Sequence, residues 1–304
     1  MVVAYVGVMD EVELIEKQIK HLYNIGVGHV IVIDSGSTDG TSEVLRDYAA
    51  KGKVTLIEGY SFGMDSAAQL RKQYEASMEE SAPDWVLIQD ADDFIIPAEG
   101  NIQKPLRGRS ADVIRLERFN IPVVEGKPLW PDEIRPETFG DLKIYCDAIG
   151  NFREHVAAHP ETPWIRGKVM PKIAARPGCV KDVKMGGHDI IPVDGMKPKY
   201  ESAVDIIVAH APISSYKRFR RKVENIRKLF SREGERFSAG MAWHWARWLA
   251  VLESGELRQE YQKQCVTPEE LAQLVHEGTV ASVEDWFARL RKRSDADAAN
   301  QRSI

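Results

Sequence analysis

Three aspartates, Asp90, Asp92 and Asp93, follow the apolar run WVLIQ at the point where a buried strand would end. Carboxylates this close repel one another and raise one another's pKa unless a positive charge lies between them. One explanation is a solvated turn, which Asp often caps. The other is a divalent cation such as Mg²⁺ or Mn²⁺, which prefers oxygen ligands and keeps positions free for phosphate. The preceding strand favours the cation, but the spacing alone leaves both explanations open.

A second polar loop, DSGSTDGT, begins at Asp34 after the apolar run VIVI. The carboxylate of Asp34 could accept a hydrogen bond from a base or a ribose. The same residue types also form an ordinary turn in which Asp39 or Thr41 caps the next helix. By itself this loop favours the structural explanation.

The elements that would position these loops alternate between strand and helix. Continuous apolar runs predict buried strands, and apolar spacings of three and four predict helices between them. The predicted strands are 2–9, 30–33, 54–57 and 85–89, and the predicted helices are 10–25, 42–50 and 65–80. This alternation predicts a mostly parallel sheet, and such sheets bind ligands beyond the carboxyl ends of their strands. Asp10, Asp34 and Asp90 each fall at such an end.

The remainder of the chain is less regular, being rich in proline to about residue 200 and mostly helical in spacing from residue 213. The last residues, SDADAANQRSI, have no large apolar side chain before the final Ile304, which is typical of disorder. The expected divisions are a catalytic domain over 1–212, with a donor half (about 1–97) and an acceptor half (about 98–212), a helical extension over 213–293 and a disordered tail over 294–304.

The composition, 43% hydrophobic and 29% charged, is that of a soluble globular protein. A net charge of −5 gives no global reason to expect nucleic acid as a partner. Three cysteines far apart argue against a disulfide framework or a cysteine-rich zinc site. No run approaches the ~18 apolar residues that span a bilayer, and the first residues lack the basic start of a signal peptide. We therefore expect a cytoplasmic protein, at most peripheral to the inner face of a membrane.

The two motifs in order resemble a known family. The stretch VGVMDEVELIEKQIKHLYNIGVGHVIVIDSGSTDGTSEVL, with DWVLIQDADDFI further on, resembles a family 2 type glycosyltransferase of the D-x-D-[DE]-F branch. The likeness covers about the first hundred residues, and the chain has MDE where that branch commonly has NE. A weaker likeness continues into KIAARPGCV, GGHDI and AHAPISSYKRFRRKV.

The resemblance implies the GT-A fold, a Rossmann-like, mostly parallel sheet flanked by helices, with a helical C-terminal region. It also implies a nucleoside-diphosphate sugar as donor, most commonly a UDP-sugar, and Mn²⁺ or Mg²⁺ as the cofactor. The implied roles are nucleotide binding for Val8, Asp10, Glu11, Asp34, Ser37, Arg71 and Asp90, and metal binding for Asp90, Asp92, His188 and His210. Asp93 would either lie near the donor sugar or brace the loop.

The chemistry of glycosyl transfer suits these residue types. Departure of the nucleoside diphosphate places negative charge on it, which a divalent cation stabilises as a Lewis acid. An inverting displacement also needs a general base for the acceptor hydroxyl. Spacing does not identify this base, for which Asp93, Glu154, Asp189 and Asp132 are the candidates.

Two C-terminal features have several explanations. The segment 216–237 has nine Lys and Arg against three Glu, so its helix is either a solvated face or one that approaches the donor diphosphate or an anionic acceptor. Its apolar stripe implies that it packs on something. Trp243, Trp245 and Trp248 favour core or acceptor-site packing, with membrane contact as the alternative.

Other functions stay open beside a glycosyltransferase. One is a Mg-dependent phosphoryl-transfer enzyme, although those enzymes usually carry their acid pair after the first strand. Another is a nucleotide-sugar-binding protein without catalysis. The acceptor could be a glycan, a lipid-linked sugar or another hydroxyl-bearing polymer, and the overall charge disfavours nucleic acid without excluding it.

Overall fold

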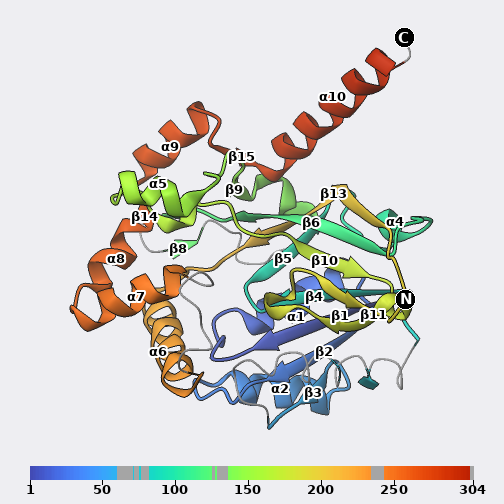
Figure 1. Ribbon diagram of the computed structural model, residues 1–304, viewed down its shortest axis with the longest axis horizontal. Coiled ribbons are helices and arrows are strands. Elements are labelled where there is room, and N and C mark those ends of the chain that lie inside the picture. Colours follow the sequence, from blue (N-terminus) through green and yellow to red (C-terminus); the bar gives the residue numbers. More distant parts are fainter. Residues whose placement is uncertain are drawn as a thin grey trace.

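The computed structural model describes residues 1–59, 71, 75–76, 82–124, 127–128, 136–233 and 243–301. Its centre is an eight-stranded sheet in the order β3-β2-β1-β4-β10-β6-β13-β5 (Figure 1). These strands are β1 (Val2–Val8), β2 (His29–Asp34), β3 (Thr55–Ile57), β4 (Trp85–Asp90), β5 (Asp93–Pro97), β6 (Val113–Asn120), β10 (Lys172–Ala175) and β13 (Tyr200–His210). β10 and β5 run opposite to the other six strands of this sheet, which are parallel. The predicted mostly parallel sheet is therefore confirmed.

Helices pack around the sheet and make up most of the C-terminal region. They are α1 (Ile15–Asn24), α2 (Thr41–Ala50), α4 (Gln103–Leu106), α5 (Phe152–Ala158), α6 (Tyr216–Glu233), α7 (Trp243–Glu253), α8 (Leu257–Lys263), α9 (Pro268–His276) and α10 (Val283–Gln301). Short 3-10 turns are η1 (Pro136–Asp141), η2 (Trp164–Arg166), η3 (Pro177–Cys179) and η4 (Met185–Gly187). The short strands are β7 (Val123–Val124), β8 (Lys127–Pro128), β9 (Lys143–Tyr145), β11 (Val180–Val183), β12 (Ile190–Pro192), β14 (Cys265–Val266) and β15 (Val280–Ser282).

The first helix is shorter than the sequence predicts, since it begins at Ile15 rather than at Asp10. Asp10 has a φ of +56°, in the left-handed region that a helix cannot use. Side chains of the loop after β2 also accept hydrogen bonds from the backbone N–H groups of Asp10, Glu11 and Val12. The segment 10–14 is consequently a loop beside the strand ends. Most of the predicted helix 65–80 lies outside the described residues; of its described residues, Arg71 is helical.

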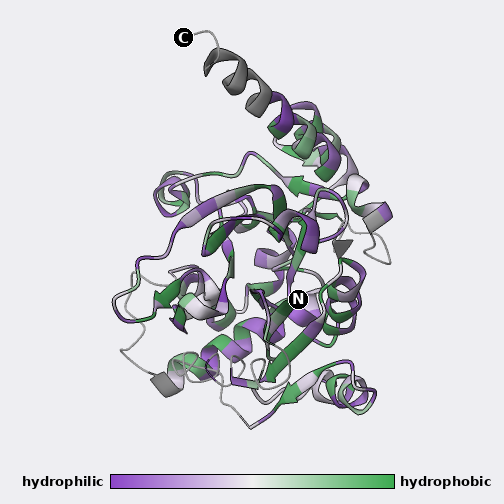
Figure 2. Ribbon diagram, turned by 90° about the vertical axis from the view of Figure 1, so that its right-hand side faces the viewer, coloured by the Kyte–Doolittle hydropathy of each residue, from purple (hydrophilic) through white to green (hydrophobic). Residues whose placement is uncertain are grey.

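The apolar core forms on both faces of the sheet. Figure 2 shows hydrophobic strands at the centre of the molecule. The strands are buried on both faces because their residues are apolar without alternation, as in parallel sheets covered by helices. A third apolar cluster joins the apolar stripe of α6, through Phe219 and Val223, to Trp248 of α7 and Tyr261 of α8. The prediction that α6 packs through this stripe is confirmed.

The C-terminal helices return to the rest of the chain through short strands. β14 pairs with β7, and β15 pairs with β9, so the segment after residue 213 shares hydrogen bonds with the predicted acceptor half. The domain boundaries stay a prediction, as does the disorder of 294–304, where the side chains lie outside the described residues. Within the described part of the chain, no helix has the length and apolar character needed to cross a bilayer.

Candidate active site

The carboxyl ends of β1, β2 and β4 meet at one edge of the sheet. In register, Val8 of β1 lies opposite Asp34 of β2, and Gly7 of β1 lies opposite Asp90 of β4. Because the parallel strands end at the same edge of the sheet, the backbone alone brings the acids that follow them close together. The sequence predicted this grouping from strand ends alone.

The three acids occupy a tight connection, since β4 ends at Asp90 and β5 begins at Asp93. Gln18 of α1 holds this turn in place by donating hydrogen bonds to the backbone oxygens of Asp90 (2.7 Å) and Asp93 (3.0 Å). The backbone N–H of Ala211 donates to the oxygen of Asp92 (2.8 Å). The Asp90 side chain is 50% exposed, whereas those of Asp92 and Asp93 are buried. The turn is therefore rigid and is not a solvated loop.

Two basic side chains of α6 neutralise Asp92. Lys222 Nζ lies 2.8 Å and Arg218 Nη2 lies 3.1 Å from the same oxygen, Oδ2. Burial on its own would raise the pKa of Asp92, but the positive charges of Lys222 and Arg218 outweigh it and hold that pKa well below its usual value. Asp92 is therefore a charged carboxylate in a buried setting.

Two further basic side chains neutralise the other acids. Lys172, whose side chain is fully buried, reaches Asp90 at 2.7 Å and Asp93 at 3.3 Å. Arg118 lies 3.3 Å from Asp93. Burial raises the pKa of Asp93 although Lys172 and Arg118 act in the opposite direction. Asp93 therefore braces the turn by ion pairs.

His210, at the end of β13, faces the remaining oxygen of Asp92. Its Nδ1 lies 2.7 Å from Oδ1 of Asn120, whose amide nitrogen donates to the oxygen of Ile165. Because Asn120 Oδ1 is an acceptor, the ring proton belongs on Nδ1, and Nε2 presents a lone pair. This Nε2 is 3.7 Å from Asp92 Oδ1. Burial and the charge of Arg118 lower the pKa of His210, so the ring is neutral.

A divalent cation fits this arrangement. Asp92, Asp93 and His210 each offer one ligand atom, and these atoms lie within 4.8 Å of one another. Asp92 Oδ1 and His210 Nε2 are both acceptor atoms and face each other, so a cation between them would stabilise this arrangement. Carboxylate oxygens suit Mg²⁺ and Mn²⁺, and a neutral imidazole is a common metal ligand.

The other predicted histidine lies beside Lys172. His188 Nδ1 bonds to the oxygen of Pro171 (2.9 Å). Burial, with the charges of Lys172 and Arg118, lowers the pKa of His188 to about 4. Among the described residues the converging ligand group contains His210 and not His188.

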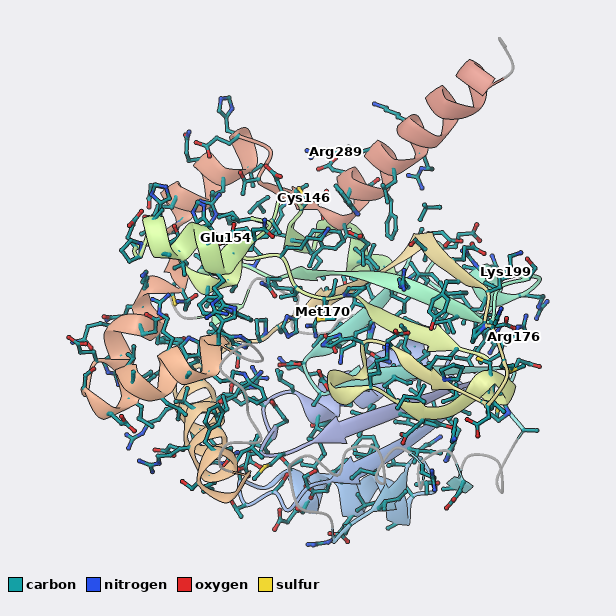
Figure 3. The ribbon with its side chains drawn as sticks, in the orientation of Figure 1. Cys146, Glu154, Met170, Arg176, Lys199 and Arg289 are labelled. Atoms are coloured by element: carbon teal, nitrogen blue, oxygen red, sulfur yellow. The ribbon has the colours of Figure 1, made fainter. Side chains whose placement is uncertain are left out.

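The predicted base candidates lie in separate parts of the fold. Asp189 bonds to Lys184 (2.8 Å) and to the hydroxyl of Tyr200 (2.9 Å). Glu154 is exposed in the first turn of α5, as Figure 3 shows. Asp132 lies outside the described residues. The identity of the base thus stays a prediction.

The loop after β1 and the loop after β2, called the donor loops below, are joined to each other. Asp34 Oδ1 accepts from the backbone N–H (2.9 Å) and the hydroxyl (2.7 Å) of Ser37, and the Ser42 hydroxyl donates to Oδ2. Asp10 Oδ1 accepts from the backbone N–H of Thr38 (2.6 Å). Through these bonds, Asp10, Asp34 and Ser37 hold the loop after β1 and the loop after β2 in place. Their contact with a nucleotide stays a prediction.

One face of α6 lies across the strand ends. At the helical spacing 218, 221, 222 and 225, its side chains reach Glu11, Asp39, Asp92 and Asp10 in turn. A small cavity remains between this face and the loop after β1, lined in part by Asp10, Asp39 and Arg221. Arg71 lines a different pocket, together with Tyr5 and Val183.

Sequence reasoning missed Arg118 and Lys172 as partners of the acids. Arg118 sits in β6 without any local motif. Lys172 opens the segment KIAARPGCV, whose weak family likeness was the available signal. The basic helix was recognised, but its individual contacts with Glu11 and Asp92 were not.

A mostly parallel sheet with a D-x-D turn at the carboxyl ends of its strands, flanked by helices, is an α/β fold of the GT-A type, as predicted. The model of glycosyltransferase family 92 matches residues 2–112, which include both donor loops and the D-x-D turn. This match confirms the prediction of a glycosyltransferase. It names a different family from the family 2 branch that the motifs resemble. A comparison with curated proteins gave no match.

Several solved structures are distantly similar to the chain. S. aureus TarS 1–349 is 13% identical over 97% of this chain and 91% of that one, with a TM-score of 0.40. Mannosyltransferase PcManGT from Pyrobaculum calidifontis, solved with GDP-Man and Mn²⁺, is 18% identical over 98% and 80%, with a TM-score of 0.39. Glucosyl-3-phosphoglycerate synthase from Mycobacterium tuberculosis is 18% identical over 59% and 58%, with a TM-score of 0.31. Likenesses this low carry no functional inference for this chain.

Proposed function

We propose that the protein transfers a sugar from a nucleoside-diphosphate sugar to a hydroxyl acceptor, in a reaction that depends on a divalent cation. The observation that carries this proposal is the pairing of Asp92 Oδ1 with the neutral Nε2 of His210, 3.7 Å apart, at the carboxyl ends of the parallel strands. A charged carboxylate and a neutral imidazole that face each other in a buried setting favour a cation site over a structural ion pair.

Asp92 and His210 would hold the cation, with Asp93 bracing the turn beneath them. The bound cation would supply charge stabilisation for the departing diphosphate. Asp90, half exposed at the end of β4, is placed to accept a hydrogen bond from a ribose hydroxyl. Lys172 orients Asp90 from the buried side.

The cations of α6 provide the second part of a diphosphate site. Lys222 and Arg218 share one oxygen of Asp92, and the Lys222 side chain is 27% exposed. The diphosphate of a nucleotide sugar carries one negative charge on each phosphate and offers these side chains several anionic acceptor oxygens, whereas the Asp92 carboxylate also serves a metal. Lys222 would therefore turn from Asp92 to the phosphate when the donor binds.

The finer features belong to the same proposal. UDP is the first nucleotide to try, an inverting outcome is expected for the D-x-D-[DE]-F branch of family 2, and Mn²⁺ is expected to serve as well as Mg²⁺. The proposed location is the cytoplasm, with contact at the inner membrane face if the acceptor is lipid-linked. The proposed acceptor is a glycan, a lipid-linked sugar or another hydroxyl-bearing polymer.

The test is a calorimetric titration of UDP, GDP, CDP and dTDP, each with Mn²⁺ and with EDTA. The wild type should bind one nucleotide in a metal-dependent way, and Asp92→Asn and His210→Ala should lose that binding. Asp194→Asn, in an exposed ion pair with Lys181, serves as the matched surface control. Absence of binding by the wild type to all four nucleotides would overturn the proposal and favour phosphoryl transfer.

A further inference from the structure

A turn beside the proposed metal site holds Trp164 in a fixed position. The amide nitrogen of Asn120 donates to the oxygen of Ile165 (2.7 Å), and the N–H of Ile165 donates to Oε1 of Gln264 (3.0 Å). Asn120 and Gln264 are both buried, and Asn120 also bonds to His210. Trp164 thus sits on a rigid turn, one side chain away from the proposed metal ligand.

Aromatic side chains gather at this turn. Trp164 stacks on His244, with ring centroids 5.1 Å apart and an interplanar angle of 26°. It also makes a T-shaped contact with Trp248, whose side chain is buried, with ring centroids 5.2 Å apart. Trp164, His244 and Trp243 all remain partly exposed. The cluster therefore has a buried base and an accessible rim.

The rim lies close to the acids of the proposed site. Burial, together with the positive charges of Lys222 and Arg118, lowers the pKa of His244 to about 4. Lys222 pairs with Asp92, and Arg118 pairs with Asp93. His244 is accordingly neutral and lies within electrostatic reach of both cations.

The cluster also lies on the side away from the nucleotide loops. In the sheet, β1 and β2 are on one side of β4, whereas β6 and β13, which carry Asn120 and His210, are on the other. The donor loops follow β1 and β2. A group bound at Trp164 would therefore lie toward β6 and β13, away from the loops that follow β1 and β2.

A polar group accompanies the aromatic rim. Arg166 lies in the same turn as Trp164, and its buried Nε has no hydrogen-bond partner in the part of the chain that the structure describes. A buried donor without a partner costs free energy unless a ligand or water satisfies it. A turn that carries both an aromatic ring and such a donor suits a molecule with an apolar face and a hydroxyl rim.

We infer that Trp164, with Trp243 and His244 beside it, forms the acceptor subsite and takes a sugar ring. The C–H face of a pyranose stacks on an aromatic face, and its hydroxyls suit Arg166. This inference rests on the proposed function, because it places the acceptor relative to the donor. Trp248 is buried, so this tryptophan packs in the core beneath the proposed subsite.

The experiment uses methyl glycosides of glucose, galactose, mannose and N-acetylglucosamine as probes. Their binding to the full chain is measured by saturation-transfer NMR and by tryptophan fluorescence, with Mn²⁺ and the best nucleoside diphosphate present. At least one glycoside should bind, and Trp164→Ala should weaken that binding about tenfold or more, as expected for loss of a stacking face. Trp164→Phe should retain most of it, which separates stacking from misfolding.

The controls distinguish the two proposals. Trp286→Phe alters a tryptophan that packs on Phe119 in the main core, and it should leave glycoside binding unchanged. Nucleotide binding, measured in parallel, should survive Trp164→Ala. Unchanged glycoside binding by Trp164→Ala would overturn the subsite. A wild type that binds nucleotide but none of the glycosides would overturn it as well. Loss of nucleotide binding in Trp164→Ala would instead show that this surface binds the nucleobase, and would overturn the acceptor subsite. Failure of the wild type to bind any nucleotide would contradict the proposed function itself.

Discussion

His210 Nε2 and Asp92 Oδ1 lie 3.7 Å apart, beyond hydrogen-bond distance, although each has its other polar atom firmly bonded. Asn120 fixes the imidazole, and the α6 cations fix the carboxylate. The two remaining atoms are therefore held facing each other by partners outside the pair. Such support from surrounding hydrogen bonds is what orients ligands before a metal arrives.

This geometry predicts different metal affinities for the acids of the D-x-D motif. Asp92→Asn should lower Mn²⁺ affinity by at least about tenfold, since it removes a charged ligand, while Asp90→Asn should change it little. Asp90 is tied to Lys172 and points to solvent. Electron paramagnetic resonance of free Mn²⁺, without nucleotide, measures both. Equal losses in the two variants would show that Asp90 is a ligand as well.

A second prediction concerns Lys172, which has its ammonium group between Asp90 and Asp93. Lys172→Met should lower the free energy of unfolding by about 3 kcal/mol, because the buried Asp93 would lose one of its two neutralising partners. Lys181→Met breaks an exposed pair with Asp194 and should cost less than about 1 kcal/mol. Urea denaturation of both variants makes the comparison. A Lys172→Met variant as stable as the Lys181→Met control would contradict the assigned role.

The strand ends were predictable from sequence, but the partners of the acids were not. A buried strand has a local signature, so the positions of Asp34 and Asp90 followed from apolar runs. The pairs Arg118–Asp93, Lys172–Asp90 and Lys222–Asp92 join residues 25, 82 and 130 positions apart. No local pattern encodes such distances. The same holds for Trp164, which reaches the site only because Asn120 and Gln264 hold its turn.

The loop before α1 was mispredicted for a related reason. Apolar spacing over 12–23 is helical, yet the backbone at Asp10 adopts a positive φ. The hydrogen bonds from residues 10–12 to Ser37, Thr41 and Asp39 come from a loop that the helical pattern does not reveal. Long-range bonding thus overrode local propensity at the edge of the site.

The third prediction is a pH dependence from His244. The folded pKa of about 4 lies below the usual histidine pKa of 6.5, so between these values the unfolded chain binds a proton that the folded chain does not. The contribution of His244 is therefore fully present above pH 6.5 and is lost as the pH falls from 6.5 toward 4. Urea midpoints for the wild type and His244→Phe, measured across this window, should show a shallower decline in the variant. Parallel declines would mean that His244 is already solvated and charged at low pH.

The last prediction concerns Asp10, a non-glycine residue with a φ of +56° just after β1. Its Oδ1 accepts from the backbone N–H of Thr38, and its Oδ2 accepts from the amide of Asn225. Asp10→Asn keeps an acceptor oxygen and tolerance of this φ, so it should cost less than about 1 kcal/mol. Asp10→Ala loses both acceptors and should cost about 2 kcal/mol, because two donors of the loop and α6 are left without partners. Thermal unfolding of the two variants, with nucleotide binding measured alongside, tests this. Equal stability of Asp10→Ala and Asp10→Asn would show that the link between the donor loops and α6 does not depend on this side chain.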